Sequence, residues 1–573
     1  MKKRLIFLFV LFVCVASRAQ VKQPNIILFL VDDMGWQDCS LPFWDKPTKL
    51  NATYHTPNME KLAAKGMMLT NAYSNAVCTP TRVSLMTGMN VARHGVTNWT
   101  NVNINTPTDF KDSLLQPARW NYNGLTPESH YTTALKHTVV ATPLPQILKE
   151  AGYYTVHAGK AHFASTGMPG ASPINMGFDV NIGGSAAGHP GSFLASKNYR
   201  QNEKDTNWAV RGLEKYIPED LYLTEAITRE AIHTLEERNA NKPFFLYLSH
   251  YAVHVPYDKD IRFYQKYIGA GLTDTEAKYA ALVEGMDKSL GDIMNYLEKN
   301  GLDKDTYILF TSDNGGLSLQ GSRSGEPHTQ NLPLKQGKGS LYEGGIRVPM
   351  IAAGPQIKPG SVSKQYIISE DYFTTILQMA SVSQKKLKQV VDGKSFLPVL
   401  QGKQKSIDEQ KTIIWHYPNN WTNVNLKGIS WASAIRQGDW KLIYFHKQQT
   451  LELYNLSIDI EERHDLSGIE VAKTKSLGVE RFATTIPLYE KSWNNFLNIS
   501  VKNPLPAYWG LADNKIEIHK TNSESFNVTL VDTGLYTNTA GRIKRIKKYI
   551  NNGGGFVGIH AATDTEYGWP WYN

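Results

Sequence analysis

Cysteine is scarce in this chain, with only Cys14, Cys39 and Cys78 among 573 residues. This excludes a small scaffold held together by many disulfides. Cys14 lies in the N-terminal apolar segment, so two cysteines remain in the body of the chain. They can form one disulfide or remain thiols, and the sequence around Cys78 adds a third possibility.

Long apolar runs are also lacking after residue 20, so we expect no stable membrane insertion. Residues 1–19 begin with Lys2-Lys3-Arg4, continue as an apolar run over 5–15 and end with small residues at Ser17 and Ala19. This pattern is typical of a secretory signal peptide. We therefore expect an exported protein, either periplasmic or secreted.

The excess of charge of one sign is small. Removal of residues 1–19, which hold four basic and no acidic residues, lowers the formal net charge from +9 to +5. Such a balance suits a polyanionic substrate but is explained equally well by scattered surface lysines. We expect no nucleic-acid partner.

Apolar runs alternate with helical patterns through the first 350 residues. This alternation predicts an α/β fold with a mostly parallel sheet covered by helices on both faces. In such sheets, ligands bind beyond the carboxyl ends of the strands. The predicted strands are 25–31, 153–158, 244–249, 306–311 and 349–353, and the predicted helices are 57–65, 145–150, 223–238 and 273–300.

The length of the chain predicts more than one domain. Residues 22–403 form the predicted α/β domain. Residues 404–500 form a smaller α+β subdomain, with a hairpin at 433–445 that turns at Gln437-Gly438-Asp439, a strand at 451–456 and a helix near 486–497. Residues 505–573 differ in sequence pattern from both preceding regions. Within them, residues 560–572 resemble part of a ThuA-like domain. We expect a linker and a fragment of such a domain there, without an activity of its own.

The segment Cys78-Thr79-Pro80-Thr81-Arg82 carries the most specific signal. It resembles the maturation motif of the type I sulfatases, Cys-x-Pro-x-Arg, in which a maturation enzyme oxidises the cysteine to formylglycine. A lone cysteine is more often a small buried hydrophobe. Other motifs of the family occur here in the family's order and span roughly residues 22–470: Asp32-Asp33, Gly159-Lys160-Ala161-His162, His254-Val255-Pro256, Asp313-Asn314-Gly315 and the run at 337–349. The resemblance implies an alkaline-phosphatase-like fold and a sulfuric ester hydrolase.

Four oxygen donors follow two of the predicted strands. Asp32 and Asp33 follow the first strand, and Asp313 and Asn314 follow the strand at 306–311. A single aspartate is more often a helix cap, but three carboxylates and an amide suit a hard cation such as Ca²⁺. The resemblance implies that the ion also contacts the converted side chain of Cys78 and one sulfate oxygen.

The basic residues of the motifs complement the acidic ones. The resemblance places Arg82 beside the formylglycine and Lys160 on the substrate sulfate, whose oxygens need hydrogen-bond donors. It implies a double displacement in which a hydroxyl of the hydrated aldehyde attacks sulfur. His254 or Lys338 then gives a proton to the leaving alcohol, and His162 takes the remaining hydroxyl proton. Many relatives have Trp where this chain has Ala161, which predicts either a different subgroup of the family or a different pocket shape.

The expected substrate is a sulfated carbohydrate. His189 and His416 lie in loop-like, aromatic-rich segments and are candidate sugar contacts, although ordinary loop packing explains them equally well. Two rival functions remain open. A phosphatase or phosphodiesterase of the same superfamily would bind two transition metals, and an inactive glycan-binding protein would keep Cys78 as a thiol.

Overall fold

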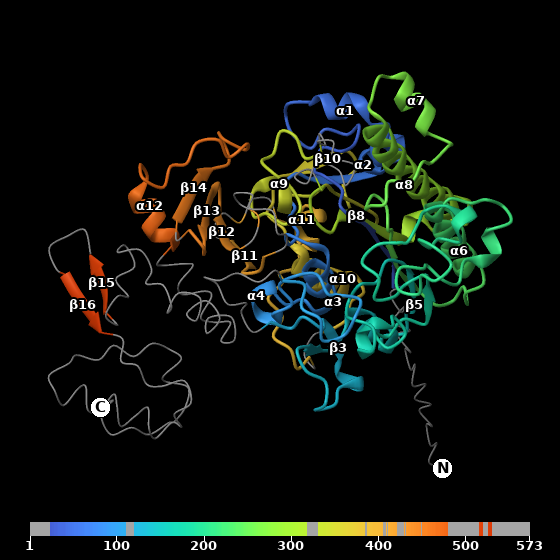
Figure 1. Ribbon diagram of the computed structural model, residues 1–573, viewed down its shortest axis with the longest axis horizontal. Helices are drawn as coiled ribbons and strands as arrows, with labels where there is room; N and C mark the ends of the chain where they lie inside the picture. Colours follow the sequence, from blue (N-terminus) through green and yellow to red (C-terminus); the bar gives the residue numbers. More distant parts are fainter. Residues whose placement is uncertain are drawn as a thin grey trace, which may run out of the picture.

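An eight-stranded sheet forms the centre of the structure, a computed structural model (Figure 1). Its central strand β1 (Asn25–Val31) runs parallel to both neighbours, β7 (Phe244–Ser249) and β8 (Thr306–Ser312). Only β9 runs antiparallel to its neighbours, so the predicted mostly parallel sheet is confirmed. In spatial order the strands are β10 (Ser361–Ser363), β2 (Gly66–Leu69), β9 (Met350–Ala353), β8, β1, β7, β5 (Tyr154–Gly159) and β6 (Val180–Ile182).

The structure describes residues 23–478, with gaps at 110–119, 318–329, 384–386, 405–407, 409–410, 421–428, 430 and 449. Beyond residue 478 it describes the strand pair β15 (Lys515–His519) and β16 (Ser525–Thr529). The predicted signal peptide at 1–19, the predicted helix near 486–497 and most of the ThuA-like fragment lie outside these residues. Within the described part of the chain, no helix has both the length and the apolarity needed to cross a membrane.

Helices cover both faces of the sheet because its central strands are apolar at every position. Alternate residues of a strand point to opposite faces. Ile27 and Phe29 of β1 pack with α2 (Pro57–Lys65), α6 (Leu223–Glu236) and α8 (Asp274–Lys299). The alternate residues Ile26 and Leu28 pack with α3 (Cys78–Thr87), α5 (Leu144–Glu150) and α10 (Ser369–Met379).

The remaining elements of the main body are short. The other helices are α1 (Lys49–Thr53), α4 (Val91–His94), α7 (Tyr264–Gly269), α9 (Glu343–Ile346), α11 (Leu397–Leu400) and α12 (Val471–Lys475). In the part of the chain that the structure describes, 3₁₀ turns lie at Glu128–His130, Pro169–Ala171, Ala195–Lys197, Glu214–Tyr216 and Asp303–Asp305. A two-stranded parallel pair joins β3 (Leu125–Pro127) and β4 (Val139–Ala141).

A smaller antiparallel sheet lies beside the main body and is drawn in orange in Figure 1. Its strands, in order, are β11 (Thr412–Tyr417), β12 (Ala432–Gln437), β13 (Trp440–Phe445) and β14 (Thr450–Asn455). The predicted hairpin is confirmed, with β12 and β13 joined by Gly438 and Asp439. One face of β11 packs against the main body, where the Trp415 indole donates to the Ser74 carbonyl at 2.8 Å.

A buried ion-pair network joins the small sheet to the main body. Lys441 of β13 donates to Glu343 of α9 and to Glu462, at 2.9 Å each, and none of the three side chains is exposed. Glu343 also accepts from Tyr73 at 2.8 Å and from Arg347 at 3.1 Å. A buried charge is tolerated only when it is paired and hydrogen-bonded, so this network fixes the small sheet against α9.

Replacement of Lys441 by Met should lower the free energy of unfolding by about 3–5 kcal/mol, because two buried carboxylates lose their shared cation. Urea unfolding followed by circular dichroism measures the change. The matched control is Lys65→Met, which removes an exposed pair with Glu298 and should cost less than about 1 kcal/mol. Equal losses for the two variants would contradict a structural role for the network.

Candidate active site

The four predicted oxygen donors meet at the carboxyl edge of the sheet. Strands β1 and β8 pair with Val31 opposite Ser312, so the residues that follow the two strands are adjacent. The Asp33 amide donates to Asp313 Oδ1 at 3.2 Å, and Asn314 Nδ2 donates to Asp33 Oδ1 at 2.7 Å. All four side chains are buried. We refer to Asp32, Asp33, Asp313 and Asn314 as the acidic cluster.

Two buried oxygens of the acidic cluster indicate a place for a cation. Asp32 Oδ1 and Asn314 Oδ1 have no hydrogen-bond partner among the described residues. Burial raises the pKa of Asp32 well above its usual value, and the nearby Asp313 carboxylate raises it further. Buried oxygens without partners are unfavourable. Two such oxygens in a set of three carboxylates and an amide fit a hard, oxygen-binding cation.

Arg82 fixes the acidic cluster to two neighbouring elements. Its Nε and Nη2 donate to Asp313 Oδ2 at 3.0 and 2.8 Å. Its Nη1 donates to the Lys160 carbonyl at 3.0 Å and to Ser249 Oγ at the end of β7 at 2.5 Å. The planar guanidinium thus holds helix α3 against the ends of β5, β7 and β8.

Cys78 is the first residue of α3 and is only 3% exposed. Cys39 and Cys78 are both free thiols, so the structure contains no disulfide between them. Burial raises the pKa of the Cys78 thiol, although the nearby Lys160 and Lys338 ammonium groups oppose this effect. The thiol therefore lies within the field of both lysines and remains protonated.

His162 faces the thiol with a defined ring orientation. Its Nε2 lies 2.9 Å from the Thr100 carbonyl and its Nδ1 lies 3.4 Å from Cys78 Sγ. A carbonyl only accepts, so Nε2 carries the proton and Nδ1 presents a lone pair. Burial and the Lys160 charge lower the pKa of His162 well below its usual value. The ring is therefore neutral, with the unprotonated Nδ1 facing Cys78.

Two lysines neutralise the acidic cluster. Lys160 Nζ lies 2.7 Å from Asp32 Oδ2, and Lys338 Nζ lies 2.7 and 2.8 Å from the two oxygens of Asp33. Although burial opposes it, the Asp33 carboxylate holds the pKa of Lys338 above its usual value. Both lysines are buried, so each is held in place by its carboxylate partner.

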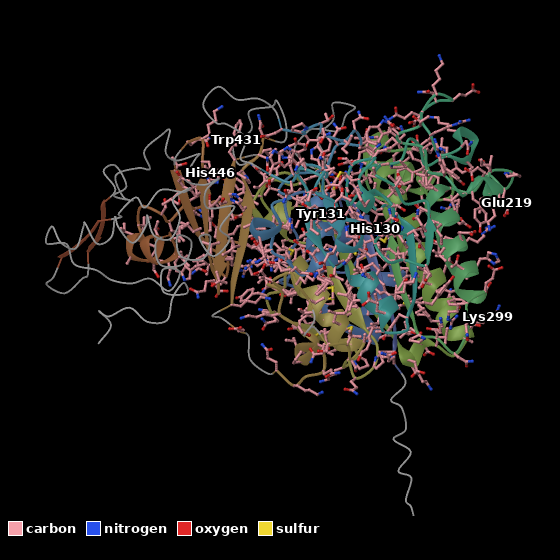
Figure 2. All side chains as sticks on the ribbon, turned by 90° about the horizontal axis from the view of Figure 1, so that it is seen from below. His130, Tyr131, Glu219, Lys299, Trp431 and His446 are labelled. Carbon is pink, nitrogen blue, oxygen red and sulfur yellow. The ribbon has the colours of Figure 1, made fainter. Side chains whose placement is uncertain are left out.

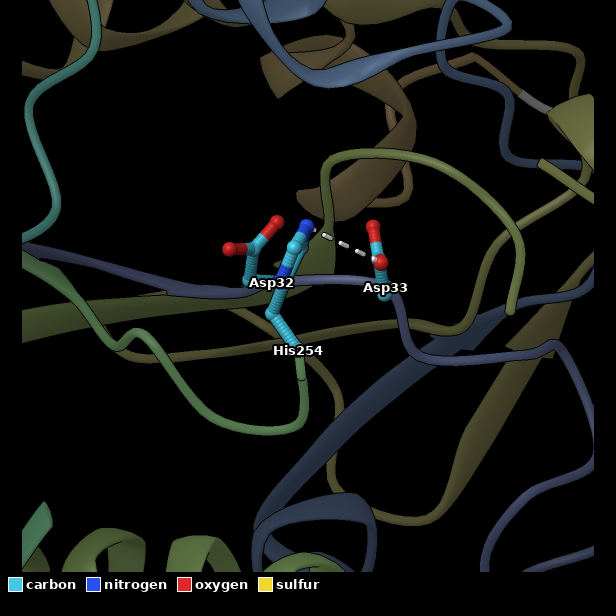
Figure 3. Close-up of side chains that lie close together, drawn as sticks. All are labelled: Asp32, Asp33 and His254. Atoms are coloured by element: carbon cyan, nitrogen blue, oxygen red, sulfur yellow. Dashed lines mark ion pairs between the residues drawn. The ribbon is translucent and has the colours of Figure 1, made fainter. Parts of the chain in front are cut away.

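His254 lies closer to the acidic cluster than its motif alone indicates. Figure 3 shows its ring between Asp32 and Asp33, with Nε2 at 3.5 Å from Asp33 Oδ2. Ligand atoms of these three residues lie within 4.8 Å of one another. Its Nδ1 donates to the Val255 carbonyl at 2.9 Å. Oxygen donors outnumber this single imidazole nitrogen, so the donor set still favours a hard cation.

The two predicted sugar contacts differ in position. His189 stacks on His254, with ring centroids 5.8 Å apart, and on Trp208, with ring centroids 4.4 Å apart. His189 thus joins the ring of His254 to that of Trp208, a residue that sequence reasoning missed. His416 instead faces away from Trp415 in β11 and bonds Ser433 Oγ at 2.8 Å within the small sheet. The geometry therefore gives His416 a structural contact and does not bring it to the acidic cluster.

Comparison with known proteins identifies the family. A family model described as "Sulfatase" matches residues 24–382. The chain belongs to the sulfatase family. It is therefore a sulfuric ester hydrolase. A second model, "N-sulphoglucosamine sulphohydrolase, C-terminal", matches residues 336–477, and the ThuA-like resemblance lies beyond both models.

Individual relatives agree with this assignment. A sulfatase of Formosa agariphila is 30% identical over 497 residues, which cover 78% of this sulfatase and 84% of the relative. Human N-acetylgalactosamine-6-sulfatase is 29% identical over 429 residues, covering 70% and 73%. The crystal structure of Ps i-CgsB has 26% identity and a TM-score of 0.63, covering 82% of this sulfatase and 93% of that chain. These similarities also confirm the predicted alkaline-phosphatase-like fold.

In protein that retains the Cys78 thiol, we expect iodoacetamide at pH 8 to label this residue at least about tenfold more slowly in the folded than in the urea-unfolded state. Burial restricts access and the raised pKa lowers the thiolate fraction. Mass spectrometry of peptides reads Cys39 and Cys78 separately. Cys39, buried and with a pKa also raised by burial, is the internal control. Equal labelling of Cys78 in both states would contradict its position.

Proposed function

We propose that this sulfatase hydrolyses sulfate esters of carbohydrates, with formylglycine derived from Cys78 as nucleophile and Ca²⁺ bound by the acidic cluster. One observation carries the proposal. Cys78 begins α3 in contact with His162 and within the electrostatic influence of Lys160, Lys338 and the acidic cluster. A buried cysteine in a structural role does not require two buried lysines and two unpartnered oxygens around it.

The substrate class is supported by the named relatives. Several of them are N-acetylgalactosamine-6-sulfatases, and one solved structure of a 26% identical protein is a complex with k-i-k-neocarrahexaose. Both names indicate carbohydrate ligands. In this chain, His189 and Trp208 present rings beside His254, and aromatic faces are common stacking surfaces for sugars. We propose that His189 contacts the sugar next to the sulfate.

The hydrated formylglycine would supply a hydroxyl nucleophile. The Ca²⁺ ion would supply positive charge for the sulfate oxygens. The residues of the chain do the rest. His162 Nδ1 lies 3.4 Å from Cys78 Sγ, the atom that an oxygen of the converted side chain would replace. Its proton on Nε2 is held by the Thr100 carbonyl. We propose that His162 accepts a proton at Nδ1 as general base.

The buried cations orient and stabilise the sulfate group. Lys160 and Lys338 are hydrogen-bond donors only, so they suit the sulfate oxygens and cannot accept from a competing hydroxyl. Their carboxylate partners fix both ammonium groups before substrate arrives, which lowers the reorganisation needed in the transition state. His254 or Lys338 protonates the leaving alcohol. Arg82 acts through Asp313 and the Lys160 backbone, and it keeps α3 in register with the acidic cluster.

The domain boundaries and the location of the protein follow from the same proposal. We assign catalysis to residues 22–403 and a supporting role to 404–500, whose Lys441 holds the segment that carries Lys338 and Glu343. Residues 1–19 direct export to the periplasm or the outside. A maturation enzyme in the host converts Cys78. We propose no activity for residues 505–573.

The nucleophile is tested by mass spectrometry of the tryptic peptide 66–82 from protein exported by its native host. We expect the aldehyde at Cys78, together with release of sulfate from sulfated mono- and oligosaccharides. Cys78→Ala should lower kcat/KM by at least about a thousandfold, because covalent catalysis is lost. A peptide with only unmodified thiol, from a host that matures other sulfatases, would instead indicate an inactive glycan-binding protein.

The metal is tested on the purified protein by elemental analysis and calorimetry. We expect one Ca²⁺ per chain, and we expect Asn314→Ala to weaken Ca²⁺ binding at least about tenfold because one neutral oxygen ligand is lost. Asn314→Asp, which keeps an oxygen at the same place, is the matched control and should retain binding. Two zinc ions per chain would contradict the proposal and favour the phosphatase alternative.

A further inference from the structure

A cavity of about 760 Å³ lies between the main body and the small sheet. Its walls come from the edge strand β10 and its neighbour β2, from the loop that follows Trp36 and from the β12–β13 turn. Among the described residues that line it, none belongs to the acidic cluster or to the groups around Cys78. The cavity is therefore a separate feature of the same molecule.

The base of the cavity holds a buried arginine that lacks a carboxylate partner. Arg436 is 3% exposed, and its guanidinium lies over the Tyr366 ring at 4.3 Å. Its Nε donates to the Gly438 carbonyl at 2.9 Å, and its Nη1 donates to the Tyr73 hydroxyl. No carboxylate oxygen of the described residues lies within ion-pair distance of it. Burial lowers its pKa to about 9, although the Asp439 and Glu462 carboxylates, which lie beyond ion-pair distance, oppose this effect.

This arrangement differs from that of the other arginines buried in the protein. Arg82 pairs with Asp313, and Arg347 pairs with Glu343. A buried cation is strongly unfavourable without an anionic partner. Arg436 has only neutral acceptors, a carbonyl and a phenol, and it lines a cavity with room for a ligand. An anion in the cavity would supply the missing charge.

The rest of the cavity wall suits an anionic sugar. Lys364 and Lys473 add positive charge at the rim, while the carboxylates that line the cavity, Asp45 and Asp439, are exposed. Trp44 and Trp440 are half-buried lining residues. A guanidinium binds the oxygens of a sulfate group through paired hydrogen bonds, and indole rings stack on sugar rings.

We propose that this cavity is a second, non-catalytic binding site for a sulfate group, with Arg436 as its anchor. The ligand is a sulfated saccharide bound away from the residues that act on it. Only the identity of the sugar rests on the proposed function, since the oxyanion chemistry follows from the cavity itself. The site would hold one part of a long sulfated chain while another part occupies the active site.

Calorimetry on full-length Cys78→Ala protein tests the site, using a sulfated oligosaccharide, its desulfated form and sodium sulfate. We expect Arg436→Met to weaken one class of oligosaccharide binding at least about tenfold, and desulfation to abolish it. If sodium sulfate binds as tightly as the oligosaccharide and this binding is lost in Arg436→Met, the result would also support the oxyanion site, with free sulfate as its ligand. Unchanged binding in a folded Arg436→Met variant would overturn the proposal.

A second variant guards against a folding defect at the buried position. Lys364→Glu places a negative charge on the exposed rim and should also weaken this binding. The control is Lys299→Glu, at the end of the molecule away from the small sheet in Figure 2, which should bind normally. Equal binding by both charge-reversal variants would count against the site.

Turnover by protein in which residue 78 is not substituted and has been converted to formylglycine separates this inference from the proposed function. Arg436→Met should raise KM for the oligosaccharide at least about fivefold and leave kcat/KM for a sulfated monosaccharide within about twofold. Loss of activity on both substrates in a folded variant would place Arg436 in the active site and overturn a separate site. Absence of any sulfatase activity in the parent protein would contradict the proposed function while the calorimetry still tests the cavity.

Discussion

Charge compensation inside the sheet edge is the constraint on which the active site depends. Three buried carboxylates, Asp32, Asp33 and Asp313, face three buried cations. Each cation comes from a different segment: Arg82 from α3, Lys160 from the end of β5 and Lys338 from the loop before α9. Because an unpaired buried charge is strongly destabilising, the pairs fix these segments relative to one another. Asp32 Oδ1 and Asn314 Oδ1 remain without a hydrogen-bond partner among the described residues.

The sequence predicted the strands that position this cluster because they are continuous apolar runs that end in polar residues. Asn25–Val31 and Phe244–Ser249 match the predicted strands residue for residue. The resemblance of short motifs to those of the type I sulfatases then pointed to Cys78, Lys160 and Lys338. The carboxyl-edge rule explains why residues 280 positions apart, such as Asp33 and Asp313, meet in space.

Other features depend on packing that no local pattern encodes. Strand β11 was not predicted, and His416 was interpreted as a loop residue although it is a buried strand residue bonded to Ser433. The antiparallel position of β9 depends on its neighbours and not on its own apolar run. No sequence pattern distinguishes Lys441 from other lysines in predicted strands. The structure shows that it donates to Glu343 and Glu462. Trp208 likewise gains meaning only from its stack with His189.

The burial of Cys78 imposes an order of events on the life of the chain. Helix α3 lies under β-strand ends and against α10, so a folded chain does not present its first residue to another enzyme. The proposed oxidation must therefore act on a chain that has not yet closed around this helix. Under the proposed function, conversion would compete with folding, and a chain that folded first would keep its Cys78 thiol. The fraction of converted protein in a preparation would then depend on the ratio of the rate of conversion to the rate of folding.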